Sequence, residues 1–368
     1  METETTLALS HKEFLQVDKD YERAAATVNL VYVTDRLPGI LRKKKGKGFS
    51  YAFNDRLIKD RQQLDRIRKL VIPPAWTQVW ICADDKGHIQ ATGLDLRGRK
   101  QYRYHPLWNS LRNETKFHRL YEFGKVLPLL RSQVEEDLRV RGLTQKKVLA
   151  TVVSVMERTF IRVGNYEYEK ANGSYGLTTL KNKHVSISGD MMKFSFKGKK
   201  GIQHDITLQN KRLARIVGQC QDIPGKELFE YYVEDGSRHP IDSGMVNTYV
   251  REATGGDFSA KDFRTWAGSR HALQDFCNME EALTDTEIKK NINIALDGVS
   301  RKLGNTRTVC RKYYVHPGLI KLYEEIKLAN YLRELDAPDN DGEDHAGLTA
   351  EEKVLMKILR ANILQRSC

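Results

Sequence analysis

The sequence predicts an α+β protein in which a small, β-rich N-terminal domain precedes a larger, mainly α-helical C-terminal domain. The chain has 368 residues, more than one hydrophobic core of ordinary size holds, so two domains are expected. Apolar and polar residues alternate between residues 76 and 104, as in strands, whereas apolar residues recur at helical spacing from residue 126 onwards. The predicted domains are residues 1–109 and 110–335, followed by an acidic linker and terminal helix at 336–368.

The first elements of the N-terminal domain follow from its charges and turn residues. Residues 37–50 (LPGILRKKKGKGFS) cannot bury their charges and are expected to form a flexible loop. This loop is either a solvated turn or a phosphate contact, and the candidates for phosphate contact are Lys43, Lys44 and Lys45. Residues 56–70 show the spacing of one helix, which the two prolines at 73–74 end. The turn residues 84–87 then predict a hairpin within 76–104.

Helices are expected to dominate the C-terminal domain. Two helical runs lie between residues 126 and 160, separated by Gly142 as a C-terminal stop and Thr144 as an N-cap. The exception is residues 184–208, where alternation across glycines predicts a small antiparallel sheet with a basic tip.

The C-terminal end combines a linker with a docking helix. Residues 336–345 are acidic, and their spacing does not fit a calcium-binding loop, so a solvated linker is expected. Thr349 and Glu352 form a capping box ahead of an apolar helical pattern. A short helix is therefore predicted to begin there.

The charge balance favours a polyanionic partner. Lys and Arg number 61 against 48 Asp and Glu, which gives a net charge of +13 and makes nucleic acid the first candidate. No stretch approaches the ~20 apolar residues that span a bilayer, and residues 1–16 lack the apolar core of a secretory signal. We therefore expect a cytosolic protein with no membrane partner.

Cysteines and short motifs argue against several other classes of site. The five cysteines are scattered, odd in number and never spaced as CxxC, which favours reduced, buried thiols over disulfides or a zinc ribbon. The sequence contains no phosphate-binding GxxxxGK[ST] loop and no HExxH. No metal, nucleotide or other cofactor is expected.

Cutting DNA without a metal requires a nucleophile, several fixed cations around the phosphate, and an acid that protonates the departing 5′ oxygen. Arginine suits this task because its planar fork binds two phosphate oxygens at once. Several segments place Arg, Lys and Tyr in such contexts: PGI at 38–40, RIRKLVIPPAW at 66–76, GLDLRGRKQYRYH at 93–105, RTFIRVGN at 158–165, GLTTLKNKH at 176–184, KDFRTWAG at 261–268 and LGNTRTVCRKYYVHP at 303–317.

Together these motifs resemble the type IB DNA topoisomerases, in particular the compact bacterial and poxvirus-like branch, over residues 32–321. The resemblance implies an enzyme that nicks one strand of duplex DNA through a tyrosine, lets the DNA relax, and reseals it without metal or ATP. It also implies the fold shared with tyrosine recombinases, with the two domains forming a clamp around DNA and residues 107–115 as the hinge. We further expect a monomer, located in the cytoplasm at the bacterial nucleoid.

The resemblance assigns the first arginine and the general acid. The family's FIRxG segment corresponds to Arg162, which Gly164 follows to make a tight turn, and the apolar residues before it argue against a surface salt bridge. The family's general-acid lysine lies just after a glycine in a hairpin turn, which matches Lys199. Lys197 and Lys200 lie at the same tip, as phosphate contacts or solvated side chains.

The second arginine corresponds to Arg264 in KDFRTW. Lys261 precedes it where the related recombinases carry His, and this favours relaxation over strand exchange. Residues three apart share a helix face, so both cations are expected to reach one phosphate, although a basic surface turn also explains Lys261.

The nucleophile corresponds to Tyr314, because the family's tyrosine immediately precedes x-His-Pro; chemistry alone does not separate it from Tyr313. Poxviral and eukaryotic members carry a histidine nine residues earlier, where this chain has Asn305. An amide donates a hydrogen bond to a phosphate oxygen but shuttles no proton, so Asn305 is expected to stabilise the transition state. Cys310 is left open as functional or packed.

DNA contacts away from the chemistry are expected on the strand around GRKQYRYH. Gln and Arg read base edges, and tyrosines stack or contact phosphates. The matching positions are Arg99, Gln101, Tyr102 and Tyr104, for which an ordinary exposed strand is the alternative. Two other activities remain as alternatives for the whole chain: a tyrosine recombinase or integrase, and a noncatalytic basic DNA-binding protein.

Overall fold

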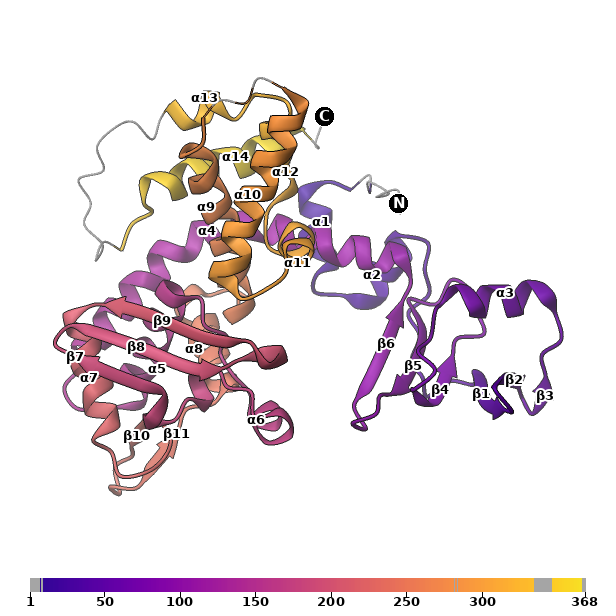
Figure 1. Ribbon diagram of the computed structural model, residues 1–368, viewed down its shortest axis with the longest axis horizontal. Helices are drawn as coiled ribbons and strands as arrows, with labels where there is room; N and C mark the ends of the chain where they lie inside the picture. The colour runs from indigo at the N-terminus through magenta and orange to yellow at the C-terminus, as the bar shows by residue number, and fades with distance from the viewer. Residues whose placement is uncertain (1–6, 8, 281, 283, 334–345, 366–368) are drawn as a thin grey trace. The chain divides into compact units, whose positions relative to one another are not determined.

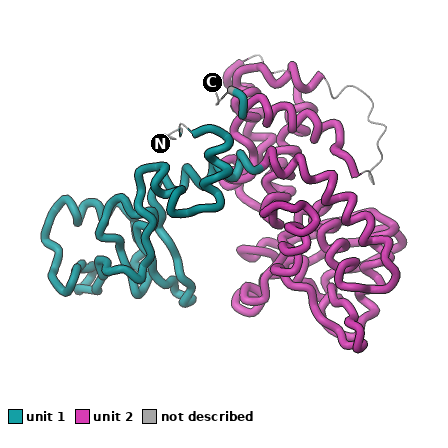
Figure 2. Tube along the Cα trace, turned by 180° about the vertical axis from the view of Figure 1, so that it is seen from behind, with its two compact units in different colours: residues 1–119, 363–368 teal, residues 120–362 magenta. Residues whose placement is uncertain are grey.

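The computed structural model describes residues 7, 9–280, 282, 284–333 and 346–365. The chain divides into two compact units, residues 1–119 with 363–368 and residues 120–362, which Figure 2 colours separately. Each unit is described by itself. The division falls within the long helix α4 (Pro106–Arg139), and the segment 107–115 that was expected to act as a hinge is helical.

Unit 1 is built on one antiparallel sheet (Figure 1). Its strands lie in the order β3-β2-β1-β4-β5-β6, so β6 is an edge strand. Apolar side chains of the sheet and of helix α3 form one core, and α1 and α2 form another with Trp108 and Leu111 of α4. The elements are α1 (His11–Val17), α2 (Tyr21–Thr27), β1 (Ile40–Lys45), β2 (Gly48–Phe53), β3 (Arg56–Leu57), α3 (Arg61–Lys69), β4 (Thr77–Ile81), β5 (Ile89–Leu94) and β6 (Lys100–Tyr104).

Two expectations for unit 1 were wrong in part. Residues 37–50 are not a loop, because β1 and β2 pair as an antiparallel hairpin that turns at Gly46. Its lysines stay exposed on the strand, so the backbone is paired while the charges remain in water. The helix expected over 56–70 begins only at Arg61, after the Asp60 side chain caps it. The hairpin within 76–104 is confirmed by the pairing of β4 with β5.

Unit 2 is mainly helical and surrounds the buried helix α5 (Gln145–Thr159). The Thr144 side chain accepts a hydrogen bond from Lys147 N–H, which confirms the predicted N-cap, and Gly142 has φ +73° before it. The other helices are α6 (Tyr166–Asn172), η1 (Leu177–Thr179), η2 (Asn182–His184), α7 (Lys211–Gln221), α8 (Ser243–Thr254), α9 (Ala260–Cys277), α10 (Asp285–Leu303), α11 (Arg307–Tyr313), α12 (Pro317–Glu324), α13 (Ala329–Leu332) and α14 (Ala350–Gln365).

The antiparallel sheet expected at 184–208 is confirmed. Strands β7 (Val185–Ser188), β8 (Met191–Lys197) and β9 (Gln203–Gln209) pair in that order, with the short turn η3 (Lys199–Gly201) at the tip. A second, two-stranded pair, β10 (Glu230–Tyr232) and β11 (Arg238–Pro240), had no sequence prediction.

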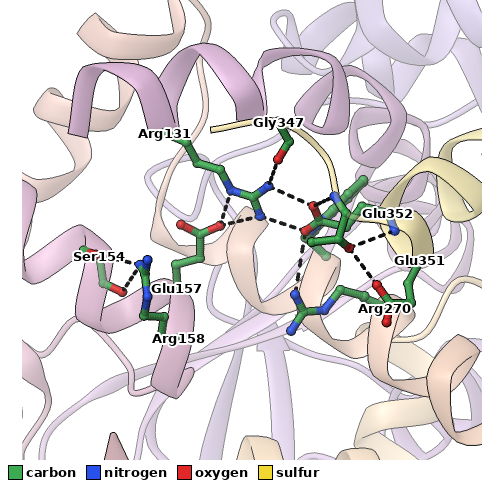
Figure 3. Close-up of polar contacts among 10 residues, drawn as sticks. Arg131, Ser154, Glu157, Arg158, Arg270, Gly347, Glu351 and Glu352 are labelled. Atoms are coloured by element: carbon green, nitrogen blue, oxygen red, sulfur yellow. Dashed lines mark hydrogen bonds and ion pairs between the residues drawn. The ribbon is translucent and has the colours of Figure 1, made fainter. Parts of the chain in front are cut away.

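Helix α14 is anchored by a buried carboxylate. The capping box is confirmed, since Thr349 N–H donates to Glu352 and Glu352 N–H donates back to the Thr349 hydroxyl. The same carboxylate accepts two hydrogen bonds of 2.8 Å from Arg131 of α4 (Figure 3). It also accepts one of 2.9 Å from the Trp266 indole of α9. Arg131 also pairs with Glu157 of α5, so one arginine ties three helices together. The acidic linker expected at 336–345 lies outside the described residues.

Two further expectations concern the burial of the cysteines and the presence of membrane-spanning helices. Cys82, Cys220 and Cys310 are free and buried as expected, but Cys277 is exposed because it ends α9 at the surface, and Cys368 lies outside the described residues. Across the described residues, we find no helix of the length and apolarity needed to cross a membrane.

Candidate active site

Arg162 lies in the loop that follows α5, and its backbone conformation is tightly fixed. Phe160 ends the helix in the left-handed region at φ 57°, and Gly164 has φ +105°, a conformation that favours glycine. The Arg162 carbonyl accepts a hydrogen bond from Leu177 N–H at 2.8 Å. Backbone hydrogen bonds therefore join the RTFIRVGN and GLTTLKNKH segments.

Helix α9 places Arg264 and also holds the segment that carries Tyr314. The Ser269 hydroxyl donates to the Tyr314 carbonyl at 3.3 Å and accepts from His316 N–H at 3.0 Å. His316 in turn caps α12, because its Nδ1 accepts from Gly318 N–H. The His-Pro motif thus fixes the backbone just after the tyrosine, while Tyr314 itself follows the last turn of α11.

Asn305 lies in the short connection between α10 and α11. Gly304 ends α10 at φ 56°, and Thr306 caps α11 through its side chain. The backbone N–H of Asn305 donates a hydrogen bond to the Ser300 carbonyl, so the backbone of Asn305 is fixed between the two caps. The LGNT motif is the sequence of this turn.

Four of the predicted residues meet at the ends of these elements. The Arg162 guanidinium donates to the Asn305 side-chain oxygen at 2.8 Å. Arg264 donates to the Leu303 carbonyl at 2.6 Å and also to the Phe160 carbonyl, and its guanidinium carbon lies 5.3 Å from the centre of the Tyr314 ring. Arg264 therefore joins the loops of the other three residues.

The cluster carries buried positive charge. Arg264 is 6% exposed, and its Nε is buried with no hydrogen-bond partner among the described residues. Burial, together with the charge of Arg264, lowers the pKa of Arg162 to about 10, and burial lowers the pKa of Arg264. Within the described residues, the hydrogen bonds found for both guanidiniums end on neutral oxygens. Such cations, fixed without a carboxylate, are suited to bind an anion.

A small cavity brings Lys199 to the same place. The lysine is exposed on the turn between β8 and β9, where Lys200 adopts φ 63°. The cavity walls include Phe160, Arg162, Gly198, Lys199, His204 and Lys302. Of the three lysines considered at this tip, Lys199 is the one that lines the cavity. Arg162 lines the same cavity and adds a second positive charge to it.

Comparisons with known proteins agree with this arrangement. Residues 105–336 match the family described as eukaryotic DNA topoisomerase I, catalytic core, and residues 48–95 match the N-terminal domain of bacterial DNA topoisomerase IB. The chain belongs to the type IB DNA topoisomerases. A DNA topoisomerase 1B of Acanthamoeba polyphaga mimivirus is 33% identical over 78% of this chain and 88% of the relative.

More distant viral relatives extend the same comparison. The DNA topoisomerase 1B of vaccinia virus (strain Western Reserve) is 23% identical over 63% of this chain and 72% of its own length. The DNA topoisomerase 1 of rabbit fibroma virus (strain Kasza) is 25% identical over 66% and 75%. Membership of the topoisomerase IB family makes the chain an isomerase that acts on duplex DNA, and it decides against the recombinase and the noncatalytic binding protein.

The surroundings of Lys261 differ from those of Arg264, and the surroundings of Tyr313 differ from those of Tyr314. Lys261 is exposed at the start of α9, and no contact found among the described residues joins it to Arg264, which points into the protein from the same helix. Tyr313 is 40% exposed beside Lys312, whereas Tyr314 is partly buried beneath Arg264. The surroundings of Tyr314 thus support the choice made from the motif.

The predicted DNA contacts of the topoisomerase lie in unit 1. Tyr102 and Tyr104 are exposed on one face of the edge strand β6, with their rings stacked 5.7 Å apart. Gln101 alternates to the other face, where Asp95 accepts hydrogen bonds from both Gln101 and Arg99. Lys43, Lys44 and Lys45 are exposed along β1. Within the strand, the two tyrosines and the glutamine therefore face opposite sides of the sheet.

Sequence reasoning missed two residues of the cavity wall, His204 and Lys302. His204 occupies a position of β9 that alternates with Ile206 toward the interior, and a histidine at such a position was the available signal. Lys302 lies two residues before Gly304 in the last turn of α10, where no motif marks it. Cys310 is fully buried, and burial raises the pKa of its thiol to about 11, so it is a packed residue.

Proposed function

We propose that this topoisomerase cleaves and rejoins one strand of duplex DNA through a 3′-phosphotyrosyl bond at Tyr314. The observation that supports this most is the position of Arg264, a buried cation that lies over the Tyr314 ring and is joined through the neighbouring loops to Arg162 and Asn305. A phosphodiester placed among these groups supplies the negative charge that the two guanidiniums lack.

In the proposed cleavage step, the Tyr314 phenolic oxygen attacks the scissile phosphorus and loses its proton to water. The bond between phosphorus and the 5′ oxygen breaks as the bond to tyrosine forms. Arg162, Arg264 and Asn305 hold the nonbridging oxygens, whose charge grows in the pentavalent transition state. Lys199, from the hairpin turn that lines the cavity, donates a proton to the departing 5′ oxygen, and Lys261 is kept as a second candidate for this role.

Rejoining is the reverse reaction. The free 5′ hydroxyl attacks the phosphotyrosyl bond, Tyr314 leaves, and the proton returns to Lys199. Because the phosphotyrosyl bond conserves the energy of the phosphodiester, no ATP or other nucleotide is required. The fixed cations stabilise the negative charge that a metal ion stabilises in metal-dependent nucleases.

The broader setting is also part of the proposal. The exposed lysines of β1 and the tyrosines of β6 are proposed to bind the DNA backbone and bases, with the 1–109 and 110–335 domains closing on the duplex as a clamp. One active site in one chain suffices for nicking and resealing, which supports a monomer. The match to a bacterial N-terminal domain supports action on DNA at a bacterial nucleoid in the cytoplasm.

The test uses the full chain on supercoiled plasmid in EDTA and without ATP. The wild-type protein is expected to relax the plasmid and to form a covalent protein–DNA adduct. Tyr314→Phe is expected to abolish both the relaxation and the adduct, whereas Tyr313→Phe retains them. An adduct formed by Tyr314→Phe but not by Tyr313→Phe would show that the neighbouring tyrosine is the nucleophile.

A further inference from the structure

His204 occupies a place between the two turns that carry Lys199 and Asn305. It pairs with Phe196 across strands β8 and β9, and the two rings stack with centroids 5.1 Å apart and planes 21° from parallel. This stacking fixes the imidazole on the side of the hairpin that lines the cavity.

Both neighbouring turns have a glycine where the imidazole approaches. A Cβ atom on Gly198 would lie 2.5 Å from one edge of the His204 ring, and a Cβ on Gly304 would lie 2.5 Å from the other. Gly198 has φ −93°, which any residue adopts, so its backbone conformation does not require glycine but the ring does. Gly198 directly precedes Lys199, and Gly304 directly precedes Asn305.

Burial and the charges around the ring disfavour its protonation. Burial, then the nearby charges of Arg162 and Arg264, lower the pKa of His204, while the adjacent Asp205 opposes them. Lys199 and Lys302 line the same cavity, so a protonated imidazole here would add a positive charge among four cations.

We propose that His204 is a positioning residue that holds the hairpin turn of Lys199 against the turn of Asn305, and so places the general acid over the departing 5′ oxygen. This inference rests on the proposed function. The imidazole itself does not contact the reacting atoms. It acts as a flat spacer between two glycines, and its neutrality allows it to remain beside the guanidiniums.

The decisive experiment compares two leaving groups in single-turnover cleavage of a duplex oligonucleotide. One substrate carries the ordinary 5′ oxygen, and the other carries a bridging 5′ sulfur, which leaves as a thiolate and needs no proton. General acid catalysis contributes about 10²–10⁴-fold, so His204→Ala is expected to slow cleavage of the oxygen substrate by at least about tenfold. On the sulfur substrate, His204→Ala is expected to match the wild-type rate, as is Lys199→Ala.

Several variants keep the interpretation specific. His204→Phe retains a stacked, flat ring and is expected to recover most of the rate on the oxygen substrate. We also expect the wild-type cleavage rate to fall at acidic pH, where His204 becomes protonated beside Arg162 and Arg264, and we expect His204→Phe to lack this fall. His239→Ala, which removes an exposed histidine of β11, is the matched control and is expected to cleave both substrates at the wild-type rate.

The outcomes separate the two levels of the proposal. An equal slowing of His204→Ala on both substrates, or no slowing on the oxygen substrate, overturns the positioning role while leaving the chemistry of Tyr314 intact. If Lys199→Ala is itself slow on the sulfur substrate, the assignment of Lys199 as general acid fails first. Failure of Tyr314→Phe to abolish the adduct overturns the proposed function and not this inference alone.

Discussion

Gly268 of α9 lies directly against the backbone of Tyr314, so close that a Cβ on the glycine would be 2.6 Å from the Tyr314 carbonyl oxygen and 2.9 Å from its Cβ. Gly268 follows Arg264 by one helical turn, so the same face of α9 presents the guanidinium and the surface on which the tyrosine rests. The distance between these two groups is therefore set by a single helix.

Gly268→Ala is expected to push Tyr314 away from Arg264 and to slow cleavage. A displacement of about 1 Å from reactive geometry costs as much as ~10²-fold in rate, so a loss of about 10-fold to 100-fold is expected. The measurement is the rate of covalent adduct formation in a single turnover, with DNA affinity determined in parallel and expected to be unchanged.

Gly218→Ala in α7 is the matched control. A Cβ there meets Ile187 at 3.8 Å, an ordinary contact, and alanine is favoured over glycine in a helix by up to about 1 kcal/mol. This variant is expected to cleave normally and to gain slightly in free energy of unfolding. Equal cleavage rates for the two alanine variants would argue against close packing as the device that positions the tyrosine.

Arg264→Lys is expected to lose cleavage activity although the charge is kept. An ammonium on a flexible chain cannot bond the carbonyls of Phe160 and Leu303 while also presenting a planar fork to the phosphate. Loss of one transition-state donor costs about 10²–10³-fold in other enzymes, and a similar loss in single-turnover rate is expected here.

A substrate with altered charge makes this test specific. If Arg264 neutralises a nonbridging oxygen, a methylphosphonate at the scissile position, which lacks one negative charge, should reduce the defect of Arg264→Lys. Arg251→Lys replaces an exposed arginine of α8 and serves as the control, with no expected change on either substrate. An undiminished defect on the methylphosphonate would assign Arg264 to positioning Tyr314 rather than to charge neutralisation.

The sequence was sufficient to predict the residues that belong to contiguous motifs. Gly164 and Thr144 follow from local rules, since a tight turn requires positive φ and a helix needs its first N–H groups capped. The contact between Arg162 and Asn305 does not follow from local sequence rules, and only the family resemblance brought the two residues together. Each of them does lie in a turn that contains a glycine, Gly164 or Gly304.

The features that were missed depend on distant parts of the chain. His204 matters because Gly198 and Gly304 close on it, and neither glycine is marked in sequence as its neighbour. The strand β1 was assigned to a loop because charged residues suggest solvent, yet a hairpin satisfies its backbone while leaving its lysines in water. Contacts with partner strands and neighbouring helices determine these features, and the pattern of one sequence segment does not show such contacts.

His271 is expected to make the protein less stable in acid. Its ring is 5% exposed, and burial, with the charges of Arg270 and Lys302, lowers its pKa from 6.5 to about 3. As pH falls below 6.5, the unfolded chain binds a proton at this residue and the folded protein does not, so folding loses free energy until about pH 3. His271→Gln is expected to flatten the loss of unfolding free energy across this window.

The measurement for His271 is the free energy of unfolding by urea at several pH values. One proton changes the free energy of unfolding by about 1.4 kcal/mol per pH unit, so the total difference between the two proteins across this pH window is expected to be a few kcal/mol. His239→Gln, an exposed position, should leave the wild-type pH dependence unchanged. If the free energy of unfolding depends on pH in the same way for His271→Gln and the wild type, protonation of the buried ring does not reduce the stability of the folded protein.

Lys43 and Lys45, which share one face of β1, are expected to contribute to the salt dependence of DNA binding. Each phosphate contact contributes about 0.9 to the slope of log affinity against log salt, so Lys43→Gln with Lys45→Gln should reduce this slope by up to ~2. Lys12→Gln, at an exposed position of α1, is the control. A uniform loss of affinity with an unchanged slope would exclude direct phosphate contacts by this pair.

Glu352→Ala is expected to destabilise unit 2 strongly, because α14 is anchored through this carboxylate. Its side chain is fully buried, and although burial opposes ionisation, the hydrogen bonds from Arg131 and Trp266 hold its pKa below the ordinary value. Removing one partner of a buried ion pair costs up to about 3–5 kcal/mol, and here Arg131 loses one of its two carboxylate partners while it keeps Glu157. The free energy of unfolding of the full chain, followed by intrinsic tryptophan fluorescence, measures this loss.

The neighbouring Glu351 provides the control for this prediction, since it contacts the Thr349 hydroxyl but is not bonded to Arg131 (Figure 3). Glu351→Ala is expected to change the free energy of unfolding by less than about 1 kcal/mol. Because Trp266 lies two residues after Arg264, Glu352→Ala should also slow cleavage at temperatures where the protein remains folded. Equal stabilities for the two alanine variants would show that the C-terminal helix is held by its apolar face and not by the buried carboxylate.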